Sequence, residues 1–192
     1  MTARKLVNVV LVAVVLVAIV GLYRLTPTRK DIQQPVAVKG VIGKPVKTPR
    51  FELTVEGVQL SKKLRVPRTT PDRDTLSDFV VVSAVVKATR EPIHLQKVEI
   101  RTSDGITYLG ANRSGLKQVD LTGFEFAPDI PARGSFVVEM PADQLPGAIL
   151  LVTERSIFTA LEPQATVPLG VEKDQLDALR KDVAIFTTAS DL

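Results

Sequence analysis

The residues from Phe79 to Thr89 carry the most regular hydrophobic pattern of the chain. Their sequence is FVVVSAVVKAT, in which every second position from Val80 to Ala88 is apolar. β-Branched side chains that repeat with a period of two favour a strand over a helix. The opposite face, from Phe79 to Lys87, mixes apolar and polar residues. The pattern predicts a central strand with one face buried in a core and the other partly covered.

Shorter stretches with alternating apolar residues precede and follow this strand. Arg50 to Leu60 predicts a strand with a bulge at Gly57, where the phase of the alternation shifts. Ser61 to Asp78 is polar and rich in Pro and Thr, which predicts a long exposed loop. The Asp104-Gly105 dipeptide predicts a hairpin turn. Further short strands are expected at 93–102, 106–108, 119–121, 135–140, 148–152 and 165–171. About seven or eight short strands with turn signals between them predict a mainly β, antiparallel sandwich.

The hydrophobic period changes after the last predicted strand. Leu176, Leu179 and Val183 fit one face of a helix, so a short C-terminal helix is expected over 172–184. Its narrow apolar stripe predicts weak docking on the sandwich or on a partner, and the tail after it is expected to fray.

The N-terminal segment is strongly apolar. Leu6 to Tyr23 is an 18-residue run in which Asn8 is the only polar residue. As a helix it would span roughly 27 Å, about the thickness of the hydrocarbon core. A cleaved signal peptide is the alternative, but no A-x-A-like cleavage site stands near Gly21. The run therefore predicts a retained transmembrane signal-anchor.

Proline and glycine recur between this run and the first clear strand, which indicates a linker with edge-strand structure near 36–41. The predicted organisation is a cytoplasmic tail, a transmembrane helix, a linker, a β-sandwich, and a C-terminal helix with its tail. The corresponding residue ranges are 1–5, 6–23, 24–49, 50–171 and 172–192.

Charge is unevenly distributed along the chain. Residues 24–73 contain 12 Lys or Arg and 4 Asp or Glu, whereas residues 74–192 contain 11 and 17. A basic first half beside an apolar segment is typical of proximity to anionic lipid headgroups, although solubilising charges in loops give the same pattern. The basic residues on the two sides of the apolar run do not decide its orientation.

Residues capable of catalysis are scarce. The chain has no cysteine, which excludes disulfides, thiolate nucleophiles, Cys-ligated zinc and a lipid-modified N-terminal Cys. His94 is the only histidine, and it alternates with Ile93 and Leu95 on the less buried face of a predicted strand. A structural role is therefore expected for it.

Two further groups of residues are candidate sites. Asp72, Asp74 and Asp78 could offer oxygens to Ca²⁺, but they lack the Gly and the distal Glu of a calcium-binding loop, which favours a solvated loop. Tyr108 and Phe124 could line a groove, but aromatic residues at strand spacing usually belong to a core. The sequence therefore predicts no enzyme activity, no catalytic, cofactor-binding or metal-binding residue, and no nucleic-acid partner.

The order of several motifs resembles a bacterial family of immunoglobulin-like extracellular domains of unknown function. Its relatives include a mycobacterial immunoprotective secreted antigen. The resemblance covers about 50–171. After the Val-rich strand, the motifs that carry it are Glu91-Pro92, Ile93 to Leu95, Ser103 to Tyr108 (SDGITY), Ile130 to Gly134 (IPARG) and Phe136 to Pro141.

This resemblance implies an immunoglobulin-like sandwich outside the cytoplasmic membrane, with the N-terminus inside, and no assigned activity. The chain departs from the family in lacking a lipid-attachment Cys and in adding the C-terminal helix; it also has no Cys-Trp-Cys arrangement. The expected function is a membrane-anchored interaction or accessory module of the cell envelope, with a membrane or envelope protein as partner. The alternative is binding of an envelope lipid or other small ligand between the sheets, which would need a cavity of roughly 300 Å³.

Overall fold

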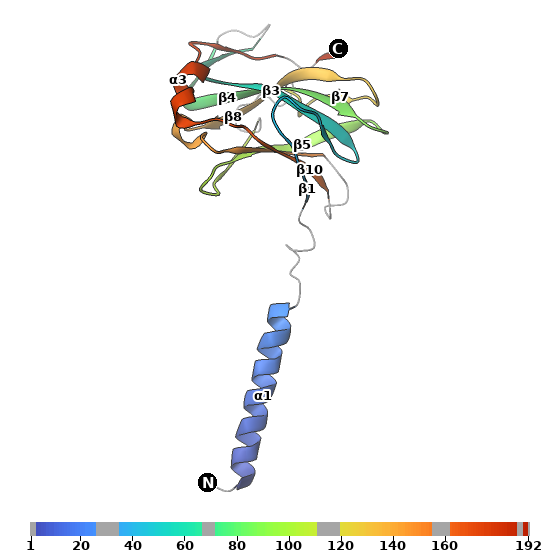
Figure 1. Cartoon of the computed structure of the whole chain (residues 1–192), viewed down its shortest axis with the longest axis vertical. Coiled ribbons are helices and arrows are strands. Elements are labelled where there is room, and N and C mark those ends of the chain that lie inside the picture. Colours follow the sequence, from blue (N-terminus) through green and yellow to red (C-terminus); the bar gives the residue numbers. More distant parts are fainter. Residues whose placement is uncertain are drawn as a thin grey trace. The chain divides into compact units, whose positions relative to one another are not determined.

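The computed structural model describes residues 3–25, 35–66, 72–110, 120–154, 162–187 and 190–191. The chain divides into two compact units, Met1–Gln34 and Pro35–Leu192. Figure 1 shows the first unit as a single helix and the second as two layers of strands.

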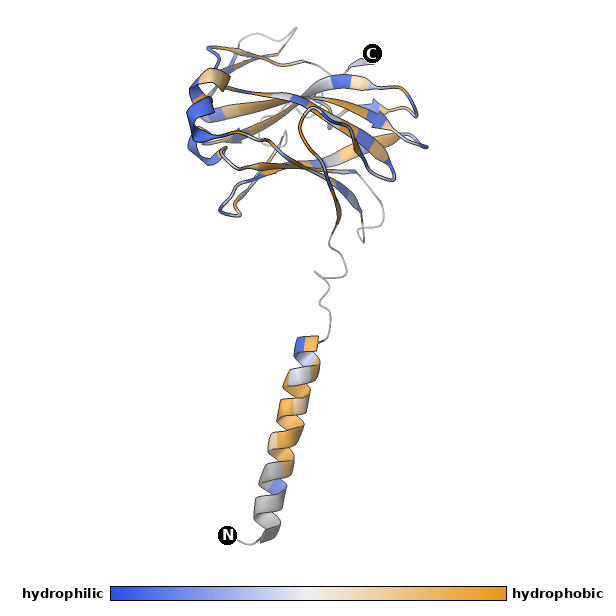
Figure 2. Ribbon diagram, in the orientation of Figure 1, coloured by the Kyte–Doolittle hydropathy of each residue, from blue (hydrophilic) through white to orange (hydrophobic). Residues whose placement is uncertain are grey.

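The helix of the first unit is α1 (Ala3–Leu25). Its 23 residues correspond to about 35 Å of helix. From Leu11 onward every side chain is exposed, and nearly all are apolar on every side of the helix (Figure 2). No helix within the described part of the chain is both long enough and apolar enough to cross a membrane. The segment predicted as a transmembrane helix, 6–23, lies within α1 and is helical. Its role as a membrane span stays a prediction.

The described residues of the second unit form two six-stranded sheets. The first sheet has the order β1 (Val36–Lys39), β10 (Pro163–Pro168), β9 (Ile149–Glu154), β5 (Ile93–Arg101), β6 (Thr107–Leu109), with β7 (Glu125–Phe126) also paired to β5. The second has the order β11 (Ala184–Ile185), β3 (Phe51–Arg65), β4 (Arg73–Ala88), β8 (Ala132–Met140), β12 (Ser190–Asp191), with β2 (Val46–Lys47) also paired to β3. The pairs β1–β10 and β11–β3 are parallel, and the others are antiparallel. These sheets confirm a mainly β sandwich, while a specifically immunoglobulin-like fold is not established by them.

Strand β4 lies at the centre of the second sheet, between β3 and β8, as its sequence predicts. Val82 stands opposite Val58 of β3 and Phe136 of β8. The predicted apolar face is completely buried over its whole length: Val80, Val82, Ala84, Val86 and Ala88. The alternation of the sequence therefore identified both the strand and the side that faces the core.

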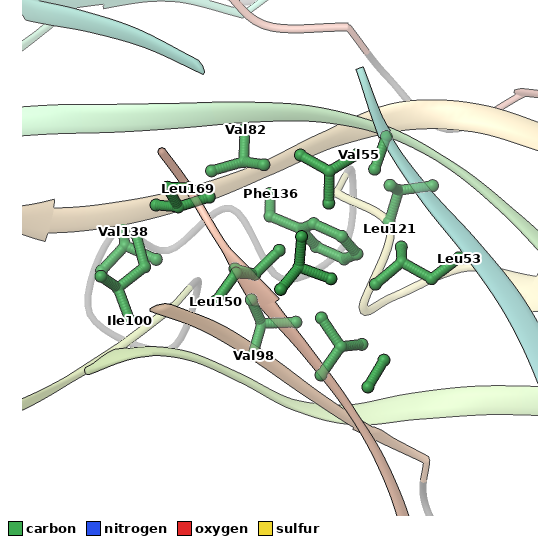
Figure 3. Close-up of a cluster of buried hydrophobic side chains, with 14 of the residues drawn as sticks. Leu53, Val55, Val82, Val98, Ile100, Leu121, Phe136, Val138, Leu150 and Leu169 are labelled. Carbon is green, nitrogen blue, oxygen red and sulfur yellow. The ribbon is translucent and has the colours of Figure 1, made fainter. Parts of the chain in front are cut away.

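The space between the two sheets is occupied by a large cluster of apolar side chains. In Figure 3, Val82 and Phe136 from the second sheet face Val98 and Leu150 from the first. All four are at most 3% exposed, so the intersheet layer is packed with side chains. Leu121, which lies in a turn and not in the predicted strand at 119–121, is also fully buried in this cluster; Val119 lies outside the described residues.

The predicted exposed loop at 61–78 is wrong over most of its length, because β3 continues to Arg65 and its antiparallel partner β4 begins at Arg73; residues 67–71 lie outside the described part of the chain. The pairing of β3 with β4 shifts register between Val55 and Gly57 and again between Ser61 and Lys63. The first shift confirms the bulge expected at Gly57. In this stretch exposed charged residues stand on both sides of buried Leu64. Its polar composition indicates a loop, although the residues repeat with the period of two that is typical of a strand.

The predicted C-terminal helix over 172–184 is confirmed in part: helical turns form at its start, but they end earlier than predicted. The segment forms two short turns, η2 (Lys173–Gln175) and α3 (Leu176–Leu179), and then becomes extended at Arg180. The amide of Lys181 donates to the carbonyl of Leu60 at 2.8 Å. Short isolated helices are marginal in water, and the edge of β3 offers backbone partners that a longer helix would forgo.

The described residues of the tail predicted to fray, 185–187 and 190–191, lie along the second sheet. Phe186 is fully buried, and its amide donates to the carbonyl of Arg65 at 2.9 Å. It belongs to a second cluster, here called the outer cluster, made of Leu64, Val66, Phe79, Val81, Val137, Ala184 and Phe186. Phe79 and Val81 alternate with the core-facing residues of β4, so this cluster lies on the opposite face of the sheet. The C-terminal segment therefore completes the second unit.

Candidate functional site

A groove of about 410 Å³ lies beside β3, where the C-terminal segment runs along that strand. Its position could not be read from the sequence, because its two walls are far apart along the chain. It is called the basic groove here and is lined by Lys62, Lys63, Arg180, Lys181, Asp182 and Val183.

The register shift in β3 and the pairing of the tail build the two walls. The shift lies between Ser61 and Lys63, and both Lys62 and Lys63 are exposed there. The hydroxyl of Ser61 donates to the carbonyl of Asp182 at 3.2 Å and accepts from the amide of Lys63 at 3.0 Å. These bonds fix the tail beside the bulge. The lining is largely apolar, as the aliphatic stems of exposed lysines and Val183 would make it.

One buried carboxylate holds two of the four cations. A guanidinium nitrogen of Arg180 donates to Asp78 at 2.8 Å, and the ammonium of Lys62 lies 3.5 Å from the other oxygen of Asp78. Lys62 also donates to the carbonyl of Ser77 at 2.7 Å. Within the described ranges the structure shows no salt bridge at the ammonium groups of Lys63 and Lys181. The groove therefore keeps positive charge that its own carboxylates do not neutralise.

The charge changes sign immediately along the chain. The turns that precede Arg180 carry three exposed carboxylates, those of Glu172, Asp174 and Asp177. With exposed Lys173 among them, the residues that precede Arg180 carry a net negative charge.

The three aspartates weighed as calcium ligands do not come together. Asp72 pairs with Arg65 at 2.7 Å, and the hydrogen bond from Arg65 holds the pKa of Asp72 below its ordinary value. Asp78 faces the basic groove from β4, while Asp74 is exposed. Across the described residues no group of three or more His, Cys, Asp or Glu side chains could hold a metal ion.

His94 is exposed on β5. Its Nε2 atom lies 3.7 Å from a carboxylate oxygen of Glu125, the residue opposite it on β7. Both side chains are about half exposed or more, so the pair is a weak surface contact.

The two aromatic residues weighed as groove residues have separate surroundings. The hydroxyl of Tyr108 donates to a side-chain oxygen of Gln144 at 2.6 Å, and Tyr108 borders a shallow depression of about 380 Å³. Phe124 packs edge-on against Phe126, with ring centroids 5.3 Å apart. The described lining of the depression includes Ser77, Tyr108, Glu139, Met140 and Pro141 but not Phe124.

A second charged cluster, which the sequence pattern did not indicate, surrounds Arg50. The Nε atom of Arg50 donates to both carboxylate oxygens of Glu154, at 3.1 and 3.2 Å, and another nitrogen donates to Glu91 at 3.0 Å. Glu154 is only 3% exposed. Burial, and then the charge of Glu154, raise the pKa of Glu162, one of whose oxygens is buried without a hydrogen-bond partner among the described residues.

Glu162→Gln is expected to raise the melting temperature at pH 7 by about 1 to 2 °C. Because the pKa of Glu162 is raised in the folded state, its contribution to stability declines as pH rises from its ordinary value of 4.5. The variant removes the charge that causes this decline. Melting curves from pH 3.5 to 7 should show the gain vanishing toward the acid end. A gain independent of pH would contradict this explanation.

Comparison with known proteins assigns no family to the chain, and the class of the second unit is given by its own two packed sheets. No protein-family model matches the chain, and no curated protein matches it. An uncharacterized beta-sandwich protein from Clostridium difficile 630 is similar in structure, with a TM-score of 0.44 and 13% sequence identity, over 75% of this chain and 99% of that chain. The second unit is a β-sandwich domain. No link to the family of the mycobacterial antigen is shown by these comparisons.

Proposed function

We propose that this chain is a single-pass, membrane-anchored β-sandwich that acts outside the cytoplasm as a protein-interaction or accessory module of the bacterial cell envelope. The observation that carries the proposal is α1, whose side chains from Leu11 to Tyr23 are exposed and carry no charge on any side of the helix. A helix without a polar face is unfavourable in water and favourable in lipid. The run from Leu6 to Tyr23 has the length of a span.

The orientation and the envelope location rest on the resemblance to the immunoglobulin-like extracellular family. The resemblance implies that the sandwich is immunoglobulin-like and that the N-terminus is cytoplasmic. It brings no activity, and the described residues supply no catalytic constellation that would argue for one.

An interaction role is favoured over binding of a lipid or other small ligand between the sheets. The intersheet space is occupied by buried side chains contributed by both sheets. A ligand of drug size would have to displace them, whereas the basic groove is already open at the surface.

Analysis of the membrane fraction tests the proposal that α1 is a retained membrane anchor. N-terminal sequencing of the membrane-fraction protein is expected to find Met1 or Thr2, and the protein should resist extraction at alkaline pH. Replacing Val14 and Leu16 by Arg should release it, because each central Arg costs roughly 3 kcal/mol on insertion. The matched control Lys39→Glu should remain in the membrane. A mature N-terminus near Pro27 would overturn the anchor.

The interaction role is tested by crosslinking in intact cells. A membrane or envelope protein should be captured through the sandwich and identified by mass spectrometry. Loss of capture on changing exposed residues of the sandwich, with membrane attachment preserved, would support the role.

A further inference from the structure

Positive charge on the basic groove comes from both of its walls. Lys63 extends from β3, and Lys181 extends from the C-terminal segment that pairs with it. Both side chains are exposed, and neither forms a salt bridge with a described residue. Asp78 pairs with Lys62 and Arg180, Asp182 is a second carboxylate beside the groove, and Lys63 acts on Asp72 only through its charge. The four cations still outnumber these groove carboxylates, and Lys63 and Lys181 are the two without a salt bridge to a described residue.

The walls are fixed before any ligand arrives. The Lys181 amide, the Ser61 hydroxyl and the Phe186 amide all bond across to the facing backbone, at 2.8, 3.2 and 2.9 Å. Phe186 is fully buried beneath this contact. A ligand that spans the two lysines therefore meets a preorganised pair of charges and does not have to order the tail.

The surroundings of the groove discriminate between anionic partners. Exposed Glu172, Asp174 and Asp177 precede Arg180 along the chain. An extended anionic surface would meet them as well as the lysines, whereas a short acidic segment can contact the groove alone. The lining contains Val183 and lysine stems, which suit the methylene groups of an amino-acid side chain. We infer that the basic groove docks an acidic segment of a protein partner, with carboxylate side chains paired to Lys63 and Lys181. This inference rests on the proposed interaction function and names its chemistry.

The mode of binding follows from the positions of the charges. Exposed ammonium groups act mainly on the rate of association and on salt dependence. Binding should therefore weaken as NaCl rises and the Debye length falls.

The inference can be tested on the full chain in phosphatidylcholine nanodiscs, with fluorescently labelled hexaglutamate as the probe and hexalysine as the opposite-charge control. Hexaglutamate is expected to bind and hexalysine is not. The double variant K63E/K181E should lower the affinity for hexaglutamate by about tenfold or more. The control K39E/K44E, which makes the same change in net charge at exposed lysines elsewhere, should stay within about twofold. K63Q/K181Q serves if charge reversal disturbs folding.

Three outcomes would overturn the inference: equal losses in the groove and control variants, no binding of hexaglutamate, or stronger K63/K181-dependent binding to phosphatidylglycerol vesicles or inorganic phosphate than to the peptide. The anchor fails separately. If the chain is released from membranes but still binds the peptide, only the proposed anchor is rejected. If the chain stays in the membrane but does not bind the peptide, only the proposed binding site is rejected.

Discussion

Val82→Asp is expected to abolish folding of the β-sandwich, whereas Lys87→Asp, on the same strand, leaves it folded. Val82 is completely buried between the two sheets, opposite Val58 and Phe136. A carboxylate there has no partner and costs several kcal/mol, a large fraction of the 5–15 kcal/mol that typically stabilises a domain. The side chain of Lys87 is 34% exposed on the opposite face of β4.

The control variant has its own small cost. Lys87 lies 4.0 Å from Glu52 and 3.8 Å from Asp129, so an aspartate there replaces two weak surface attractions by repulsion. We expect a loss of about 1 kcal/mol or less, which lowers the melting temperature by a few degrees. Thermal denaturation of the full chain, followed by circular dichroism, should show a cooperative transition for Lys87→Asp and none for Val82→Asp. Equal melting temperatures would show that the two faces of β4 are assigned wrongly.

The contrast between these variants shows what the sequence could predict. The period of two in β4 depends only on neighbouring residues, and alternation places every second residue on one face. It correctly predicted the central strand and its buried side. The turn at Asp104-Gly105 was predicted on equally local grounds, and Gly105 does have a positive φ of 85°.

The C-terminal segment could not be predicted in this way. Leu176 and Leu179 pack against the apolar cluster between the two sheets, as one face of a helix would. Val183 completes the same pattern in the sequence, but the chain is already extended at Arg180. The backbone partner that stops the helix is Leu60, which is distant in sequence and invisible to any periodicity.

The basic groove and the Arg50 cluster could not be predicted from the sequence for a related reason. In the sequence, Lys62-Lys63 and Arg180-Lys181 each look like a pair of solubilising charges. Only the pairing of the tail with β3 brings the two pairs to one groove. Similarly, Glu154 is buried beside Arg50 by the packing of separate sheets, and no local pattern marks either residue.

Phe186→Ala is expected to destabilise the sandwich by about 3–5 kcal/mol, which corresponds to a fall in melting temperature of roughly 6 to 20 °C. Phe186 is fully buried in the outer cluster, against residues of β3, β4 and β8. Its removal leaves a cavity and exposes part of Phe79 and Val81 to water. The neighbouring Ile185 is 64% exposed, so Ile185→Ala should lower the melting temperature by no more than about 2 °C.

Deleting 172–192 should have a larger effect than Phe186→Ala, because it also removes β11, β12 and the turns that hold Leu176 and Leu179 against the main core. The narrow apolar stripe in the sequence predicts a weakly docked helix, whose deletion would lower the melting temperature by only a few degrees. The structure predicts the opposite: the tail covers an apolar face of the second sheet, and its loss uncovers Phe79, Val81 and Val137 together. Calorimetry of the full chain, Phe186→Ala, Ile185→Ala and the truncated chain decides between the two. If the truncated chain melts within a few degrees of the full chain, the tail is a detachable contact element, and the outer cluster contributes little to the stability of the fold.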